Sequence, residues 1–181
     1  MSLKELTADK HREAETTSFM RAVFARTLPQ ELWIDWTYQK TLFYHTLENA
    51  ASTLGLLNDL PDIRRAFYLY EDFKEMANDQ HFLKFKNPTK EYHNYLLSIN
   101  QDPDKIMAHM YTWHMGDLFG GQMIKKIIPG SHRALEFSDA KTLMTNIREK
   151  INDSMAEEAN IAFDWAIRMM RDYDKDLGAV T

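Results

Sequence analysis

Two short stretches of the sequence carry residues whose types and spacing suggest chemistry. The stretch HMGDLFGGQM, residues 114–123, holds three glycines and one acid among apolar neighbours. A glycine inside a helix costs about 1 kcal/mol relative to alanine, so Gly116, Gly120 and Gly121 need a physical reason. Close helix packing, a kink, or main chain lying against a ligand would each supply one. Spacing alone slightly favours close packing between helices. Asp117 instead favours a pocket that holds water, because a carboxylate is costly to bury in a water-free helix interface.

The second stretch, LKELTADKHREAE at residues 3–15, centres on His11. Helical spacing places Lys4, Ala8 and Glu15 on the same face as this histidine. The small neighbours leave room for a flat ligand in front of the ring, and Glu15 is placed to accept the other ring N–H and fix the tautomer. A surface histidine on an amphipathic helix is the alternative, and spacing alone favours it.

Other kinds of catalytic centre find little support. The remaining histidines show no HExxH spacing, and no Glu-x-x-His pair indicates a di-iron carboxylate site; they are His45, His81, His93, His109, His114 and His132. The segment GDLFGGQ lacks the Lys-Ser/Thr ending of a phosphate loop. No Gly-x-Ser-x-Gly motif is present.

Composition bounds the class of protein. The chain has 181 residues, of which 44% are hydrophobic and 27% charged, as in a globular protein of one domain, residues 1–181. Its net charge of -5 argues against a nucleic-acid partner. It has no cysteine, which excludes disulfides, thiolate zinc sites and iron–sulfur clusters. There is no secretory signal and no run of apolar residues long enough for a membrane anchor, so we expect a cytoplasmic protein.

Helix signals follow one another along the chain, and no alternating apolar run indicates a sheet. The fold class is therefore all-α, an irregular helical bundle. We expect a first helix that opens at Ser2 with a capping box to Glu5. The remaining helices are expected from Pro29 or Asp35 to Leu54, from near Pro61, after Pro88, from Asp102-Pro103 until Pro129, over 138–151, and over 154–177 with Gly178 as a C-cap.

Together, the two stretches resemble the proximal and distal helices of the haem oxygenase family. The residues that carry this resemblance are LKELTADKHREAE and AHMYTWHMGDLFGGQMIKK, in this order and about a hundred residues apart. LFYHTLENA and EEANIAFDW extend it over most of the chain, and REKIN is similar to the plant and cyanobacterial branch. A source in a cyanobacterium, or in a virus that infects one, fits this pattern.

The resemblance implies a haem oxygenase-like bundle with haem between two helices and a set of roles for single residues. By this match His11 is the proximal iron ligand, Glu15 the acid near it, and Asp117 the acid that organises distal water. Gly116, Gly120 and Gly121 match the glycines whose backbone lies over the haem. The other matching positions are Lys4 and Arg148 near the propionates, with Lys141 as a substitute for Arg148, and Tyr44, Tyr111 and Phe163 lining the pocket.

The implied reaction opens haem b, which is both substrate and cofactor, to biliverdin IXα, CO and Fe²⁺ by attack at the α-meso carbon. It uses O₂ and an external reductant, expected to be ferredoxin in a photosynthetic setting, and it would feed phycobilin synthesis. Lys125 and Lys126 offer a cationic rim for docking of an acidic redox partner. One alternative is a haem-binding carrier or sensor on the same fold. Another is a helical interaction protein whose glycines form a packing seam.

Three positions depart from the common family pattern. Phe119 stands where serine is frequent, Trp113 where many members have arginine, and His114 where tyrosine is common. The first two changes could alter the distal water network without removing its acid. The segment over residues 137–157 also looks shorter than usual, which bears on the assignments of Lys141 and Arg148.

Overall fold

The computed structural model describes residues 1–78 and 83–178, so His81 and residues 179–181 lie outside the described part. The described residues form helices with no strand among them. These are α1 (Leu3–Leu6), α2 (Ala8–Glu15), α3 (Ser18–Phe24), α4 (Gln30–Thr53), α5 (Ala66–Ala77), α6 (Asn87–Ser98), α7 (Pro103–Phe119), α8 (Gly121–Ile127), α9 (Ala140–Lys150) and α10 (Ala156–Arg171), with 3₁₀ turns η1 (Arg133–Leu135) and η2 (Asp153–Met155). The all-α expectation is confirmed.

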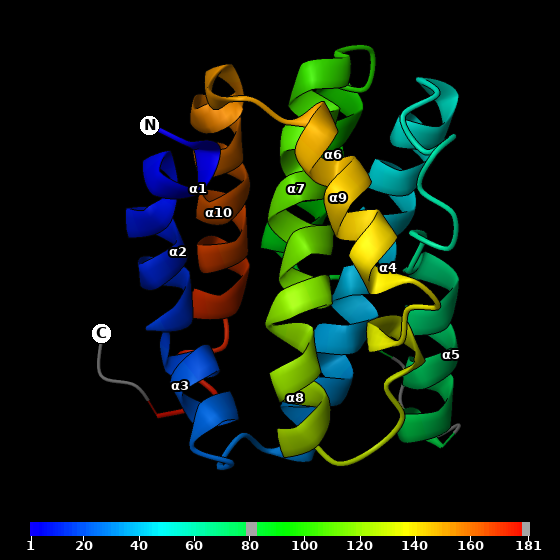
Figure 1. The fold of residues 1–181 in the computed structure, drawn as a ribbon. Coiled ribbons are helices and arrows are strands. Elements are labelled where there is room, and N and C mark those ends of the chain that lie inside the picture. Colours follow the sequence, from blue (N-terminus) through cyan, green and yellow to red (C-terminus); the bar gives the residue numbers. More distant parts are fainter. Residues whose placement is uncertain (79–82, 179–181) are drawn as a thin grey trace.

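Two long helices, α4 and α10, organise the bundle (Figure 1). The α4 helix packs against α5, α6 and α7, and α10 packs against α2, α3, α6 and α7. In Figure 1 the α10 helix lies between α2 on one side and α7 on the other. Both helices that carry the predicted site residues therefore pack against the same helix. No described helix is long and apolar enough to cross a membrane.

The N-terminal segment is not one helix, although its predicted start is confirmed. The Ser2 side chain accepts the N–H of Glu5, and the Glu5 carboxylate accepts the N–H of Ser2, which completes the capping box. The helix is interrupted at Thr7, whose backbone has φ -106° and ψ 0°. The Thr7 hydroxyl donates to the Leu3 carbonyl at 2.9 Å, a local bond that competes with the helical ladder. Lys4 on α1 is thereby separated from His11 on α2.

The α4 helix begins at Gln30 with Pro29 as N-cap, so the earlier of the two predicted starts is correct. Gly55 follows its end with a φ of +73°, as expected for a helix stop. The predicted helix start near Pro61 is wrong, because α5 begins at Ala66. The intervening turn is fixed by Arg65, which is fully buried.

Arg65 and Glu48 explain why α5 starts where it does. The Arg65 guanidinium donates to the carbonyl of Glu136 at 2.6 Å and to the Asp62 carboxylate at 2.8 Å. The Glu48 carboxylate of α4 accepts the backbone N–H groups of Arg65 and Ala66. Glu48 thus satisfies N–H groups at the first turn of α5 that have no partner inside the helix.

The predicted helix from Asp102-Pro103 to Pro129 is wrong in its length. Its start is confirmed, since the Asp102 side chain accepts the N–H groups of residues 104 and 105. It is divided at Gly120, where α7 ends at Phe119 and α8 begins at Gly121. The divided helix keeps its direction, because Gly120 has φ -65° and ψ -31° and donates to the Gly116 carbonyl.

The C-terminal pair of helices forms, but both helices are shorter than predicted. The α9 helix starts after Asp139, whose side chain accepts the N–H of Thr142. The α10 helix ends at Arg171, and residues 172–177 continue as turns. The prediction of Gly178 as the C-cap is wrong, because the C-cap of α10 is Asp172; Gly178 has a φ of +65° and ends the turns that follow.

Candidate functional site: an exposed histidine, a glycine-bearing helix and a buried acid

His11 stands on α2 with its ring directed at a neighbour from α10. Its side chain is 55% exposed. The ring meets that of Phe163 edge-on, with centroids 5.7 Å apart and an interplanar angle of 82°. Phe163 is itself buried, so it fixes one edge of the imidazole while the rest of the ring stays accessible. This is the arrangement that a histidine needs to bind a flat ligand from the open side.

Glu15 follows His11 by one helical turn, as its spacing predicts. Its Oε1 lies 3.6 Å from His11 Nε2, within ion-pair range but beyond a hydrogen bond. Both side chains are about half exposed. Glu15 is therefore placed near the ring without being bonded to it.

The three glycines of residues 114–123 have different surroundings. An added Cβ at Gly116 would meet nothing within 4 Å, and Gly116 and Gly120 are both exposed. A Cβ on Gly121 would stand 2.7 Å from Leu135 Cδ2, and Gly121 is buried. Close packing therefore explains Gly121, whereas it does not explain Gly116.

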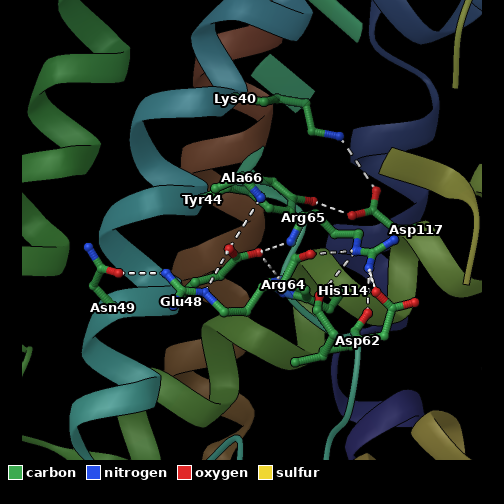
Figure 2. Close-up of polar contacts among 11 residues, drawn as sticks. Lys40, Tyr44, Glu48, Asn49, Asp62, Arg64, Arg65, Ala66, His114 and Asp117 are labelled. Atoms are coloured by element: carbon green, nitrogen blue, oxygen red, sulfur yellow. Dashed lines mark hydrogen bonds and ion pairs between the residues drawn. The ribbon is translucent and has the colours of Figure 1, made fainter. Parts of the chain in front are cut away.

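Asp117 is buried, with its side chain 10% exposed, and is bonded to α4 (Figure 2). The Tyr44 hydroxyl donates to Asp117 Oδ2 at 2.6 Å, and Lys40 Nζ lies 3.5 Å from Asp117 Oδ1. Burial, reinforced by the Asp117 charge, raises the pKa of Tyr44 well above its ordinary value. Tyr44 therefore remains protonated and acts as a donor. The buried acid follows the exposed Gly116 in the chain and is held by two groups from one face of α4.

A second buried polar pair lies one turn away on both helices (Figure 2). His114 Nε2 is 3.0 Å from Glu48 Oε1, and both side chains are fully buried. Because the Glu48 carboxylate accepts from α5 as well, this pair links three helices. His114 Nδ1 has no hydrogen-bond partner within the described residues. Glu48 also borders an open cavity of about 860 Å³ between α4 and α5, which none of the sequence-predicted site residues lines.

Trp113 belongs to a different network, on the side of α7 that faces α6. Its indole N–H donates to the Tyr92 hydroxyl at 2.9 Å, and that hydroxyl lies 2.7 Å from His109 Nδ1. His109 Nε2 lies 2.9 Å from the Glu158 carboxylate. Since a carboxylate only accepts, His109 donates through Nε2 and accepts through Nδ1. Trp113 is thus tied to the core, and its ring also meets that of Tyr44, the donor to Asp117, with centroids 5.9 Å apart.

Phe119 and Arg148 meet at the exposed end of α7. The Arg148 guanidinium carbon stands 5.7 Å from the centroid of the Phe119 ring, within cation–π range. Phe119 is 51% exposed, unusual for a phenylalanine. The contact places Arg148 beside the end of α7, and a serine at position 119 would not offer Arg148 an aromatic ring.

Among the described residues, the other predicted binding residues form no hydrogen bond or ion pair with His11 or Asp117. Lys4 and Lys141 are exposed, and Tyr111 is half-buried on α7. The predicted cationic rim is partly neutralised, because Lys125 Nζ lies 3.3 Å from the Glu136 carboxylate. Lys126 is exposed on α8.

Sequence reasoning missed Lys40 and the Glu48–His114 pair. Lys40, Tyr44 and Glu48 are four residues apart in succession and so share one face of α4. Polar residues at that spacing inside an apolar helix were the available signal. His114 and Asp117, three residues apart, supply the matching face of α7.

The exposed imidazole of His11 lies on α2, and the exposed Gly116 and Gly120 lie on α7 and at its end; both helices pack against α10. A histidine of this kind would hold the metal of a flat macrocycle, and glycine would let the helix backbone come close to that ligand. Asp117, next to Gly116 in the chain, is buried and accepts the hydrogen bond of the Tyr44 phenol.

Comparison with known proteins identifies a family that matches most of this chain. A family model described as heme oxygenase matches residues 1–147. Heme oxygenase 2 of Mus musculus is 23% identical over 96% of this chain, and the chain spans 64% of that relative's length. Heme oxygenase of the red alga Porphyra purpurea is 24% identical over 97% of this chain and 86% of its own.

Solved structures show the same fold. Heme oxygenase-1 of the cyanobacterium Synechocystis, in complex with heme, superposes with a TM-score of 0.85 at 22% identity, over 97% of this chain and 91% of its own. Heme oxygenase-2 of Synechocystis, in complex with heme and NO, gives 0.86 at 24% identity, over 98% and 85%. The family model matches residues 1–147, which is most of the chain, and the fold agrees with it; this chain belongs to the haem oxygenase family.

Proposed function

We propose that this chain cleaves haem b at the α-meso carbon to biliverdin IXα, with release of CO and Fe²⁺. The observation that carries the proposal is the exposed His11 ring on α2 together with the open space in front of Gly116 on α7. A side chain at position 116 would occupy that space, and nothing else in the fold requires a glycine there. Haem, when bound, supplies the iron at which O₂ reacts.

Each side of the ligand would have its own residues. His11 would hold the iron through its imidazole, with Phe163 supporting one edge of the ring and Glu15 near the other. Gly116 and Gly120 would let the main chain lie against the opposite face. Lys4 and Arg148 would attract the propionates and so set the rotation of the ring, which decides the carbon that is attacked.

Proton handling would fall to Asp117 and Tyr44. Burial raises the pKa of Tyr44, so its hydroxyl stays protonated and donates a hydrogen bond to Asp117. Asp117 then remains available to exchange a proton with water on the haem side. We expect Gly121 to act indirectly, by seating α8 against Leu135.

We further propose that the electrons come from an acidic redox protein, ferredoxin, and that the bilin enters phycobilin synthesis. The similarity of REKIN to the plant and cyanobacterial branch supports this, as do the red algal relatives. Lys126 is an exposed cation on α8, the helix that begins at Gly121, and Lys125 would have to leave Glu136 to contribute.

The test is haem binding followed by turnover. Addition of haemin should give a Soret band whose position changes in His11→Ala and does not change in His45→Ala, a matched exposed histidine on α4. With O₂ and ascorbate or reduced ferredoxin, the band should be replaced by biliverdin absorbance. A stable Soret band would indicate a haem carrier or sensor, and no Soret band an interaction protein. An unchanged spectrum in His11→Ala would refute the ligand assignment.

The acid is tested separately. Asp117→Ala should bind haem yet form little or no biliverdin, and Asp117→Asn, which keeps the shape, should behave alike. Full biliverdin yield with native kinetics in either variant would remove Asp117 from the reaction.

A further inference from the structure

Lys40 is a nearly buried cation that the site described above does not use. Its side chain is 12% exposed, although lysine is rarely buried unless it is paired. It lies on α4 one turn before Tyr44, and its ammonium stands 5.0 Å from the centroid of the Tyr44 ring. Its only carboxylate within ion-pair distance, among the described residues, is Asp117.

Lys40 and Tyr44 of α4 each contact a different oxygen of the Asp117 carboxylate. Tyr44 donates to Oδ2 at 2.6 Å, and Lys40 approaches Oδ1 at 3.5 Å (Figure 2). Tyr44 is held by burial, so its bond alone leaves the carboxylate free to turn about one oxygen. Lys40 supplies the second point that fixes the plane of the carboxylate.

A small cavity of about 60 Å³ borders both Lys40 and Asp117. Its polar lining includes Asp72, Ser131 and His132. A water molecule needs roughly 10 to 15 Å³ of such volume and two to four polar partners, so the cavity is large and polar enough for water. The 3.5 Å separation is longer than the usual 2.7–2.9 Å of a charge-assisted hydrogen bond, which suits a contact that water can share.

We propose that Lys40 is a positioning residue of the haem reaction, which holds the Asp117 carboxylate in the orientation from which it exchanges protons. The proposal rests on the proposed function, because it concerns the acid assigned to that reaction. Replacing Lys40 by an apolar side chain would leave the buried carboxylate without its compensating charge.

The other charged and titratable groups around Asp117 do not replace Lys40. From α4 there is Tyr44, which is neutral. From α7 itself there is His114, which is bonded to Glu48. Across the cavity, Asp72 is paired with Arg133, and His132 bonds the Ile128 carbonyl through Nε2.

The first test uses the haem-free protein and does not depend on turnover. In Lys40→Met, the ¹³C NMR shift of the Asp117 carboxyl carbon at a fixed pH, assigned with Asp117→Asn, should change, because the ammonium beside Oδ1 is lost. Lys40→Arg should restore the shift toward the native value. Lys90→Met, which removes an exposed lysine from α6, should leave it unchanged. If Lys40→Met does not fold, Lys40→Gln is measured in its place.

The second test uses the haem complex. Lys40→Met should lower kcat with little change in the Kd for haem, and it should shift the pH titration of the ferric haem spectrum. Lys40→Arg should recover both. An unchanged ¹³C shift of the Asp117 carboxyl carbon in Lys40→Met would overturn the proposal, as would a loss of haem affinity in proportion to kcat that arginine does not rescue. If native protein binds no haem, the proposed function fails, and the ¹³C shift alone then shows whether Lys40 acts on the Asp117 carboxylate.

Discussion

Gly116→Ala should change the stability of the haem-free protein and its affinity for haem in opposite directions. Gly116 lies within α7, its φ is not positive, and an added Cβ meets nothing within 4 Å. Alanine in a helix interior is more favourable than glycine by about 1 kcal/mol. With no steric cost to set against this, the haem-free variant should be more stable than the native protein. For a chain of this length, about 1 kcal/mol raises the Tm by roughly 2–4 °C.

The same methyl group should weaken haem binding. If the ring lies against Gly116, the added group overfills the contact, which costs about 1–3 kcal/mol. This corresponds to a rise in the Kd for haem of roughly 5- to 150-fold. Tm is measured by circular dichroism on haem-free protein, and Kd by titration of the Soret band.

Gly121→Ala is the matched control. Its Cβ would stand 2.7 Å from Leu135 Cδ2, so the helix-propensity gain is opposed by overpacking until Leu135 moves. Its Tm should lie below that of Gly116→Ala. A lower Tm in Gly116→Ala than in the native chain would refute the open-space argument. An unchanged Kd for haem in Gly116→Ala would show that the ring does not lie there.

Three further changes test other parts of the structure. Burial lowers the pKa of His109 below its ordinary value of 6.5, so the unfolded chain binds more protons there. The contribution of His109 to the free energy of unfolding is full above about pH 6.5 and is lost as the pH falls toward the lowered pKa. Urea unfolding at a series of pH values should show this loss. In His109→Gln the free energy of unfolding should depend less on pH over that range. Trp113→Phe should lower the free energy of unfolding by about 1 kcal/mol, because the bond to Tyr92 is lost, with haem affinity unchanged; a lost Soret band would contradict this. Phe119→Ser should remove about 0.5–1 kcal/mol of cation–π attraction from Arg148 and weaken haem binding roughly two- to fivefold, which titration at low salt measures; tighter binding would exclude Arg148 as a propionate contact.

The fold class and most helix starts follow from local signals. Ser2, Pro29, Asp102 and Asp139 act at helix N-termini through bonds made within one turn or through a fixed φ. The start of α5 could not be predicted in this way. It is set by Arg65 and Glu48, whose partners are distant in sequence.

In the candidate site, too, some features follow from local sequence and others depend on contacts between distant segments. His11, Asp117 and Gly116 stand out by type and spacing, and the resemblance to a family assigns their expected roles. Their surroundings depend on which helix packs opposite. Lys40 looks like a solvated lysine in the sequence, and only the packing of α4 on α7 places it beside Asp117. Likewise, the sequence cannot show that Gly121 faces Leu135 while Gly116 faces open space.

The central claim is that this chain binds haem at His11 and converts it to a bilin with the help of Asp117. The most direct measurement is a single turnover of the haem complex with O₂ and reduced ferredoxin, with analysis of the pigment by chromatography and of the CO released. The account predicts one equivalent each of biliverdin IXα and CO from the native chain, and haem loss without biliverdin in Asp117→Ala. A haem complex that survives the reaction unchanged, or equal biliverdin from native and Asp117→Ala protein, would contradict it.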